Sequence, residues 1–167
     1  LHESTNFLIG GGLDDVWHDP KTDEIFIVDY KSTAGRRNED LTALQEISLV
    51  GAYKETYKRQ MDMYQWIMRQ NGFNVNKTGY FVYVNGDQHF ENGMLEEDID
   101  KANMKFDVQL LSYEADDSWV NQVILDLKDC LLQKSCPQHA QSGFGPKGDK
   151  QCEQAQLFEG MKEHGLI

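Results

Sequence analysis

Proline, cysteine and long apolar runs are all scarce in this chain of 167 residues, and each scarcity excludes a class of protein. Three prolines beside a 40% hydrophobic content exclude collagen-like and disordered chains. No apolar run approaches the roughly 20 residues that a membrane-spanning helix needs, so we expect a soluble chain. Three cysteines, all after residue 129, do not make a disulfide framework, which favours a reducing cytoplasm.

Basic residues are also in short supply. Sixteen of them against 28 acidic residues give a net charge of −12, which argues against nucleic-acid binding through a broad basic surface. Of the three stretches 1–40, 41–80 and 81–167, only the second is net positive, with 5 bases and 3 acids. If an anion binds, we therefore expect it between Lys31 and Arg69.

The length fits one domain with one core, residues 1–167. Because the chain opens with Leu1 and has no signal peptide, we interpret it as a fragment of a longer protein. The polar, glycine-rich segment 133–167 is expected to be irregular.

Hydrophobic patterning predicts an α/β domain with a mixed central sheet led by a β-hairpin and flanked by helices. The hairpin strands are expected at 7–17 and 25–31, around a polar turn at 18–24. The remaining elements are a helix at 53–70, strands at 78–84 and 104–113, and a helix at 119–131 capped by residues 116–118.

The hairpin places charged residues together. If it is symmetric about Lys21 and Thr22, paired residues have numbers that sum to about 43, so Asp14 lies opposite Asp29. Strand alternation then puts Lys31 on the same face as both carboxylates. Neighbouring carboxylates in apolar strands need a positive partner, and a divalent cation held by oxygen ligands supplies one. Such a site supports phosphodiester hydrolysis, while the alternative is that these carboxylates are merely solvated.

Three motifs follow in order: Gly11-Gly12-Leu13-Asp14, then Val28-Asp29-Tyr30-Lys31, then Gln60-Met61-Asp62-Met63-Tyr64. They resemble the G-x-x-D, D-x-K and Q-x-x-x-Y motifs of the RecB-like branch of the PD-(D/E)XK nuclease superfamily. The resemblance covers about half of the chain and implies a restriction-endonuclease-like core.

Site roles follow from this resemblance. It implies that Asp14, Asp29 and the Tyr30 carbonyl bind Mg²⁺ or Mn²⁺, and that Lys31 is the catalytic lysine. Gln60 and Tyr64 would support the site and approach the nucleic-acid backbone, although periodicity alone equally allows Tyr64 to be core. Relatives also carry a Glu or His on an upstream helix, which the six residues before the first strand cannot form.

A basic rim beside the site is a further expectation. Its members come from the one stretch that acids do not dominate, and they would follow the phosphates of a bound strand, unless they are simply solvated charges. They are Arg36, Arg37, Lys54, Lys58 and Arg59.

The cysteines indicate no standard metal site. Some relatives hold an iron–sulfur cluster, but Cys152 is followed by Ala155 where a second cysteine would stand. Cys130, Cys136 and Cys152 with His139 fit no usual zinc spacing.

Together these observations predict an Mg²⁺- or Mn²⁺-dependent DNA nuclease. Its DNA would have single-stranded character, and its partner would be a helicase or another chain of a DNA-processing complex. The rival interpretation is an inactive nuclease-fold module that binds single-stranded DNA or a protein.

Overall fold

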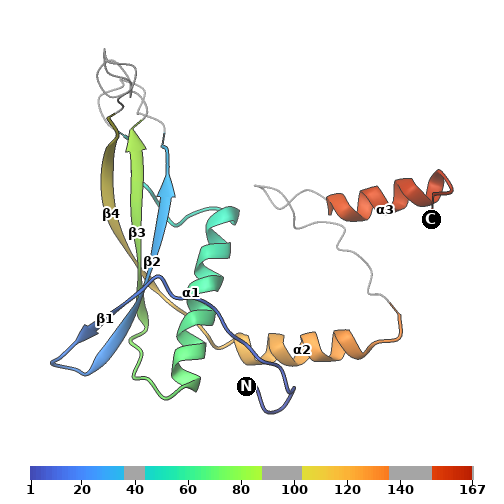
Figure 1. Ribbon diagram of the computed structural model, residues 1–167, viewed down its shortest axis with the longest axis horizontal. Helices are drawn as coiled ribbons and strands as arrows, with labels where there is room; N and C mark the ends of the chain where they lie inside the picture. Colours follow the sequence, from blue (N-terminus) through green and yellow to red (C-terminus); the bar gives the residue numbers. More distant parts are fainter. Residues whose placement is uncertain (36–43, 88–102, 136–151, 167) are drawn as a thin grey trace.

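The computed structural model describes residues 1–35, 44–87, 103–135 and 152–166. This part of the chain forms an α/β structure with a four-stranded mixed sheet and three helices (Figure 1). In chain order, the elements are β1 (Asp15–Asp19), β2 (Glu24–Thr33), α1 (Ala52–Gln70), β3 (Thr78–Asp87), β4 (Lys105–Glu114), α2 (Val120–Leu132) and α3 (Glu153–Glu163).

The sheet has the strand order β1-β2-β3-β4. The β1–β2 hairpin and the β3–β4 pair are antiparallel, whereas β2 and β3 are parallel and α1 lies between them in the chain. The expected mixed sheet led by a hairpin is therefore confirmed. Among the described residues, no helix is long and apolar enough to cross a membrane.

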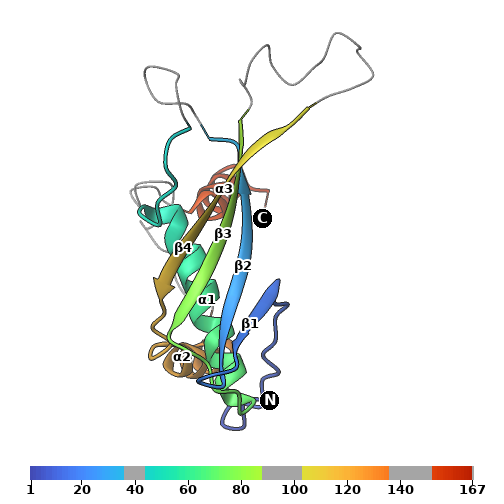
Figure 2. The same ribbon diagram turned by 90° about the vertical axis from the view of Figure 1, so that its left-hand side faces the viewer.

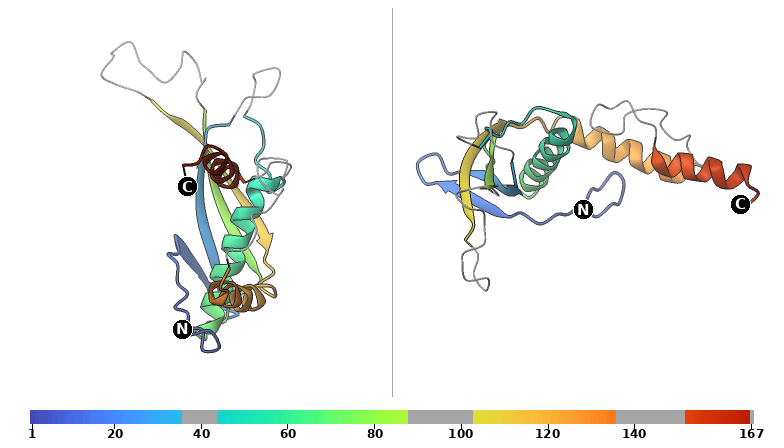
Figure 3. Two further views of the ribbon diagram at one scale, coloured as in Figure 1. Left: turned by 90° about the vertical axis from the view of Figure 1, so that its right-hand side faces the viewer. Right: turned by 90° about the horizontal axis from the view of Figure 1, so that it is seen from above.

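Helix α1 covers one face of the sheet, and α2 lies at its C-terminal end on the same side (Figures 2 and 3). The main core lies in this interface, where Met61 of α1 packs with Ile27, Phe81 and Tyr83 of the central strands. Helix and sheet approach so closely at Gly79 that a Cβ there would clash with the Met61 sulfur.

The opposite face of the sheet is not covered by any described helix (Figure 3). Tyr30, Val108 and Leu110 lie on that face and are 47%, 65% and 54% exposed. In the described part of the chain, helices therefore cover only one face of the sheet.

Three expectations about the elements need correction. Strand β1 begins at Asp15 rather than residue 7, and the glycine-rich stretch before it is not a strand. No side chain caps α2, since Asp116 accepts from Ser118 N within the preceding loop. The segment 133–167, expected to be irregular, contains the helix α3.

Asp62 joins three elements beneath the sheet. It is 4% exposed, and its carboxylate accepts hydrogen bonds from Tyr113 Oη of β4 at 3.1 Å, from Asp116 N at 3.0 Å and from Trp119 Nε1 at 3.0 Å. Burial raises the pKa of Asp62, while these donors act in the opposite direction. The β4–α2 connection is thereby fixed to α1.

We predict that Asp62→Ala lowers the free energy of unfolding by about 3 kcal/mol, because three part-buried hydrogen bonds to its carboxylate are lost. Urea denaturation of this variant and of Asp126→Ala measures the effect, since Asp126 is exposed on α2 and accepts a hydrogen bond from Gln122 one turn away. Equal, small losses in both variants would show that the Asp62 contacts are not needed for the fold.

Candidate functional site

The register of the hairpin brings Asp14 beside Asp29. Asp15 pairs with Val28, so paired numbers sum to 43 and the loop symmetry predicted from the sequence is confirmed. The ladder ends there, and the Asp14 carboxylate accepts a hydrogen bond from Tyr30 N at 2.8 Å. Asp14 is therefore held by β2 through its side chain, at the open end of β1.

Asp29 points to the face that α1 covers and is 2% exposed. Lys31 Nζ lies 2.6 Å from Asp29 Oδ2, yet this oxygen has no well-directed hydrogen bond among the described residues. Burial raises the pKa of Asp29, Lys31 opposes that change, and the nearby Asp14 carboxylate adds to it. The two carboxylates are thus close enough to repel each other, as predicted.

A continuous set of contacts links Asp29 to the helix. Lys31 Nζ donates to Gln60 Oε1 at 3.1 Å, and Gln60 Nε2 donates to Tyr64 Oη at 2.7 Å. Because Gln60 and Tyr64 are one helical turn apart on α1, both can reach the sheet. The structure therefore brings together Asp29, Lys31, Gln60 and Tyr64, which the sequence predicted as site residues.

Gly11 completes the link between the three motifs. A Cβ at Gly11 would lie 2.8 Å from Tyr64 Cε1, so the glycine leaves room for the tyrosine ring against the backbone that leads into β1. Tyr64 also packs against the hydrophobic core. The structural and site-supporting interpretations of Tyr64 therefore both apply.

Three aromatic and basic residues at the site were missed or placed differently by the sequence interpretation. The Tyr57 ring lies under Lys31 Nζ, 4.6 Å from its centroid. Lys54 Nζ donates to Tyr83 Oη at 2.7 Å and lies 4.2 Å from the centroid of that ring. Burial raises the pKa of Tyr83 to about 12, so its hydroxyl keeps its proton at neutral pH. The spacing Lys54, Tyr57, Gln60, Tyr64 follows one face of α1 and was the available signal.

The donors that could hold a divalent cation are two carboxylates. Among the described residues, no group of three His, Cys, Asp or Glu side chains is placed to bind a metal. Asp14 and Asp29 are nevertheless suited to Mg²⁺, which takes one or two carboxylates and fills its other positions with water and phosphate. A cation there would share the buried Asp29 Oδ2 with Lys31 Nζ, which lies 2.6 Å from this oxygen. The Tyr30 carbonyl remains a prediction.

The predicted basic rim is only partly described. Arg36 and Arg37 lie outside the described residues. Lys58 Nζ pairs with Glu55 Oε1 at 2.7 Å, and Arg59 is exposed. Lys54 is half-buried and turned toward Tyr83 instead of lying on an outer rim.

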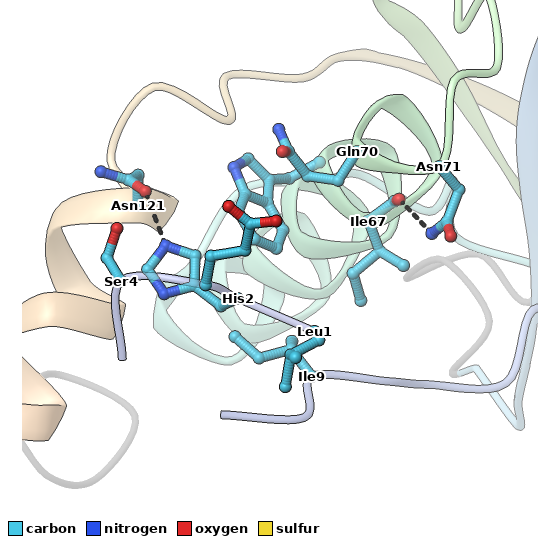
Figure 4. Close-up of a pocket in the computed structure, with 10 residues that line it drawn as sticks. Leu1, His2, Ser4, Ile9, Ile67, Gln70, Asn71 and Asn121 are labelled. Atoms are coloured by element: carbon cyan, nitrogen blue, oxygen red, sulfur yellow. Dashed lines mark hydrogen bonds between the residues drawn. The ribbon is translucent and has the colours of Figure 1, made fainter. Parts of the chain in front are cut away.

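The chain start and the cysteines lie apart from these contacts. His2 and Glu3 are not helical, as expected, and His2 Nε2 lies 2.9 Å from Asn121 Oδ1. His2 and Asn121 help line a pocket of about 400 Å³ at the C-terminal end of α1, which none of the predicted site residues lines (Figure 4). Cys130 and Cys152 are free thiols, while Cys136 and His139 lie outside the described residues.

Comparisons with protein-family models, with curated proteins and with solved structures found no match to the chain.

We predict that Gly11→Ala lowers the free energy of unfolding by about 1–2 kcal/mol, because the added methyl group displaces the Tyr64 ring. Gly12→Ala is the matched control, since a Cβ there meets nothing within 4 Å, and it should change stability by less than about 0.5 kcal/mol. Thermal or urea unfolding compares the two. Equal losses would mean that Gly11 does not form the contact with Tyr64.

Proposed function

We propose that the chain is an Mg²⁺- or Mn²⁺-dependent nuclease of the RecB-like type that hydrolyses DNA phosphodiester bonds. The observation that carries the proposal is the contact series from Asp29 through Lys31 and Gln60 to Tyr64. Residues of two separate motifs meet in it, and Asp14 and Gly11 of the third adjoin it. The hairpin-led mixed sheet with α1 across one face is compatible with a restriction-endonuclease-like core.

In this proposal Asp14 and Asp29 hold the cation, which would lower the pKa of a bound water and stabilise charge on the phosphate. Lys31 stabilises the charge that develops on the scissile phosphate or orients the attacking water. Asp29, Gln60 and the Tyr57 ring together fix the Lys31 ammonium, so little reorganisation is needed when substrate binds. Gln60 acts through Lys31 as a positioning residue.

The substrate in this proposal is DNA with single-stranded character, within a larger DNA-processing complex. Support comes from charge: the stretch 41–80, which contains α1, is net positive, whereas the stretches on either side are net negative and would repel a phosphate backbone.

A second candidate is an inactive module of the same fold that binds DNA or a protein partner. One observation favours it: Lys31 already neutralises Asp29 at 2.6 Å, which weakens the need for a cation. Cleavage assays with labelled DNA, Mn²⁺ and an EDTA control separate the two candidates. DNA binding without metal-dependent cleavage would select the inactive module.

We predict that Asp29→Asn abolishes metal-dependent cleavage, because it replaces a charged metal ligand by a neutral amide. Asp15→Ala should keep most activity, since its carboxylate bonds Tyr30 Oη at 2.9 Å and Trp17 Nε1 at 3.2 Å, away from the α1 side. Initial rates on the same DNA provide the measurement. Equal loss in two folded variants would show that the metal-binding carboxylate is wrongly assigned.

We also predict that Mn²⁺ affinity falls on acidification at a higher pH than an ordinary aspartate would give. Burial raises the pKa of Asp29, and only its ionised form binds metal, so binding is lost as pH falls through that raised pKa. Calorimetric titration with Mn²⁺ across a pH series, with circular dichroism to confirm folding, tests this. An affinity that is unchanged down to about pH 4 would contradict Asp29 as a ligand.

A further inference from the structure

Lys54 differs from the other described lysines near the site because its hydrogen-bond partner is neutral. Lys31 pairs with Asp29 and Lys58 with Glu55, whereas the partners of Lys54 in the described part of the chain are the neutral hydroxyl of Tyr83 and two aromatic rings. No carboxylate among the described residues forms an ion pair with it. A half-buried ammonium without a counter-ion is costly, and burial indeed lowers the pKa of Lys54. An anion bound there would offset this cost.

The position of Lys54 relative to Lys31 indicates which anion. The Tyr57 centroid lies 4.6 Å from Lys31 Nζ and 5.4 Å from Lys54 Nζ, so the two ammonium groups are at most about 10 Å apart. Neighbouring phosphates on one strand lie within such a distance. Lys54 Nζ also donates a hydrogen bond to Tyr83 Oη, and because Tyr83 is 1% exposed, this contact holds the ammonium from the core side and leaves any anion to approach Lys54 from outside.

We propose that Lys54, positioned by the buried Tyr83, forms a second anion position, which binds the phosphate adjoining the scissile one on the same nucleic-acid strand. This inference rests on the proposed nuclease function. Lys31 serves the phosphate at the two carboxylates, and Lys54 holds the strand one phosphate further along, toward the N-terminal turn of α1. Lys54 is a binding residue here and takes no part in the chemical step.

The test uses single-stranded DNA of about twelve nucleotides and the otherwise complete chain carrying Asp29→Asn, so that binding is measured without cleavage. Adding Lys54→Gln should weaken binding about tenfold and lower the slope of log affinity against log salt by about 0.7, the value of one lost phosphate contact. Lys21→Gln is the matched control, because Lys21 is an exposed lysine of the hairpin turn and the same charge is removed. It should change affinity by less than about twofold.

Two further variants separate binding from a structural role. Lys54→Arg keeps the charge and should restore most of the affinity. Tyr83→Phe keeps the packed ring but removes the hydroxyl that positions the Lys54 ammonium, and it should weaken binding about threefold. Thermal unfolding confirms that the variants are folded. If Lys54→Arg binds as weakly as Lys54→Gln, the lysine acts through packing and the inference is overturned.

An oligonucleotide that lacks bases tests whether Lys54 contacts a phosphate or a base. An equal Lys54→Gln effect on the abasic strand supports a phosphate contact, whereas loss of the effect would assign Lys54 to a base and overturn the inference. If the unmodified chain cleaves DNA but Lys54→Gln behaves like Lys21→Gln, only this inference fails. If the chain neither cleaves nor binds DNA, the proposed function fails and the inference with it.

Discussion

The ion pair between Asp29 and Lys31 is the constraint on which the arrangement of the site depends. A carboxylate that is 2% exposed in the middle of a sheet costs several kcal/mol to desolvate unless a cation lies beside it. Lys31, two residues further along the same strand face, supplies that charge at 2.6 Å. Its ammonium must in turn be held in place, which the Gln60 amide and the Tyr57 ring of α1 do. The sheet and the helix are therefore joined by polar contacts as well as by the apolar core.

Helix α1 serves two purposes with one face. Met61 on this face packs into the hydrophobic core, while Lys54, Tyr57, Gln60 and Tyr64 contact the site or its surroundings. Their spacing of three and four residues is the spacing that a core-facing stripe requires. The polar residues on this otherwise core-facing stripe are thus explained by a site at the border of the core. There, part-buried polar side chains form hydrogen bonds with one another.

Much of this arrangement could be predicted from the sequence because it is local. The hairpin register followed from the symmetry of its loop, and that register alone placed Asp14 opposite Asp29. The periodicity of residues 53–70 likewise predicted α1 to within one residue at its start. Contacts across layers were not accessible in this way. The helical spacing placed Lys54 on the same face as Gln60 and Tyr64, but it did not show that Lys54 turns inward onto Tyr83 while Lys58 pairs with Glu55 on the helix surface. The helix α3 was missed because the segment around it is rich in polar residues and glycine.

The most direct test of the account is a crystal of the chain grown with Mn²⁺ and examined by anomalous diffraction. We predict one strong anomalous peak between Asp14 and Asp29, with carboxylate oxygens at about 2.1 Å from the ion, and loss of that peak in Asp29→Asn. The contrary result is a crystal with the same hairpin register and a saturating Mn²⁺ concentration, but with no anomalous peak between the two carboxylates. It would contradict the metal centre and the proposed nuclease with it.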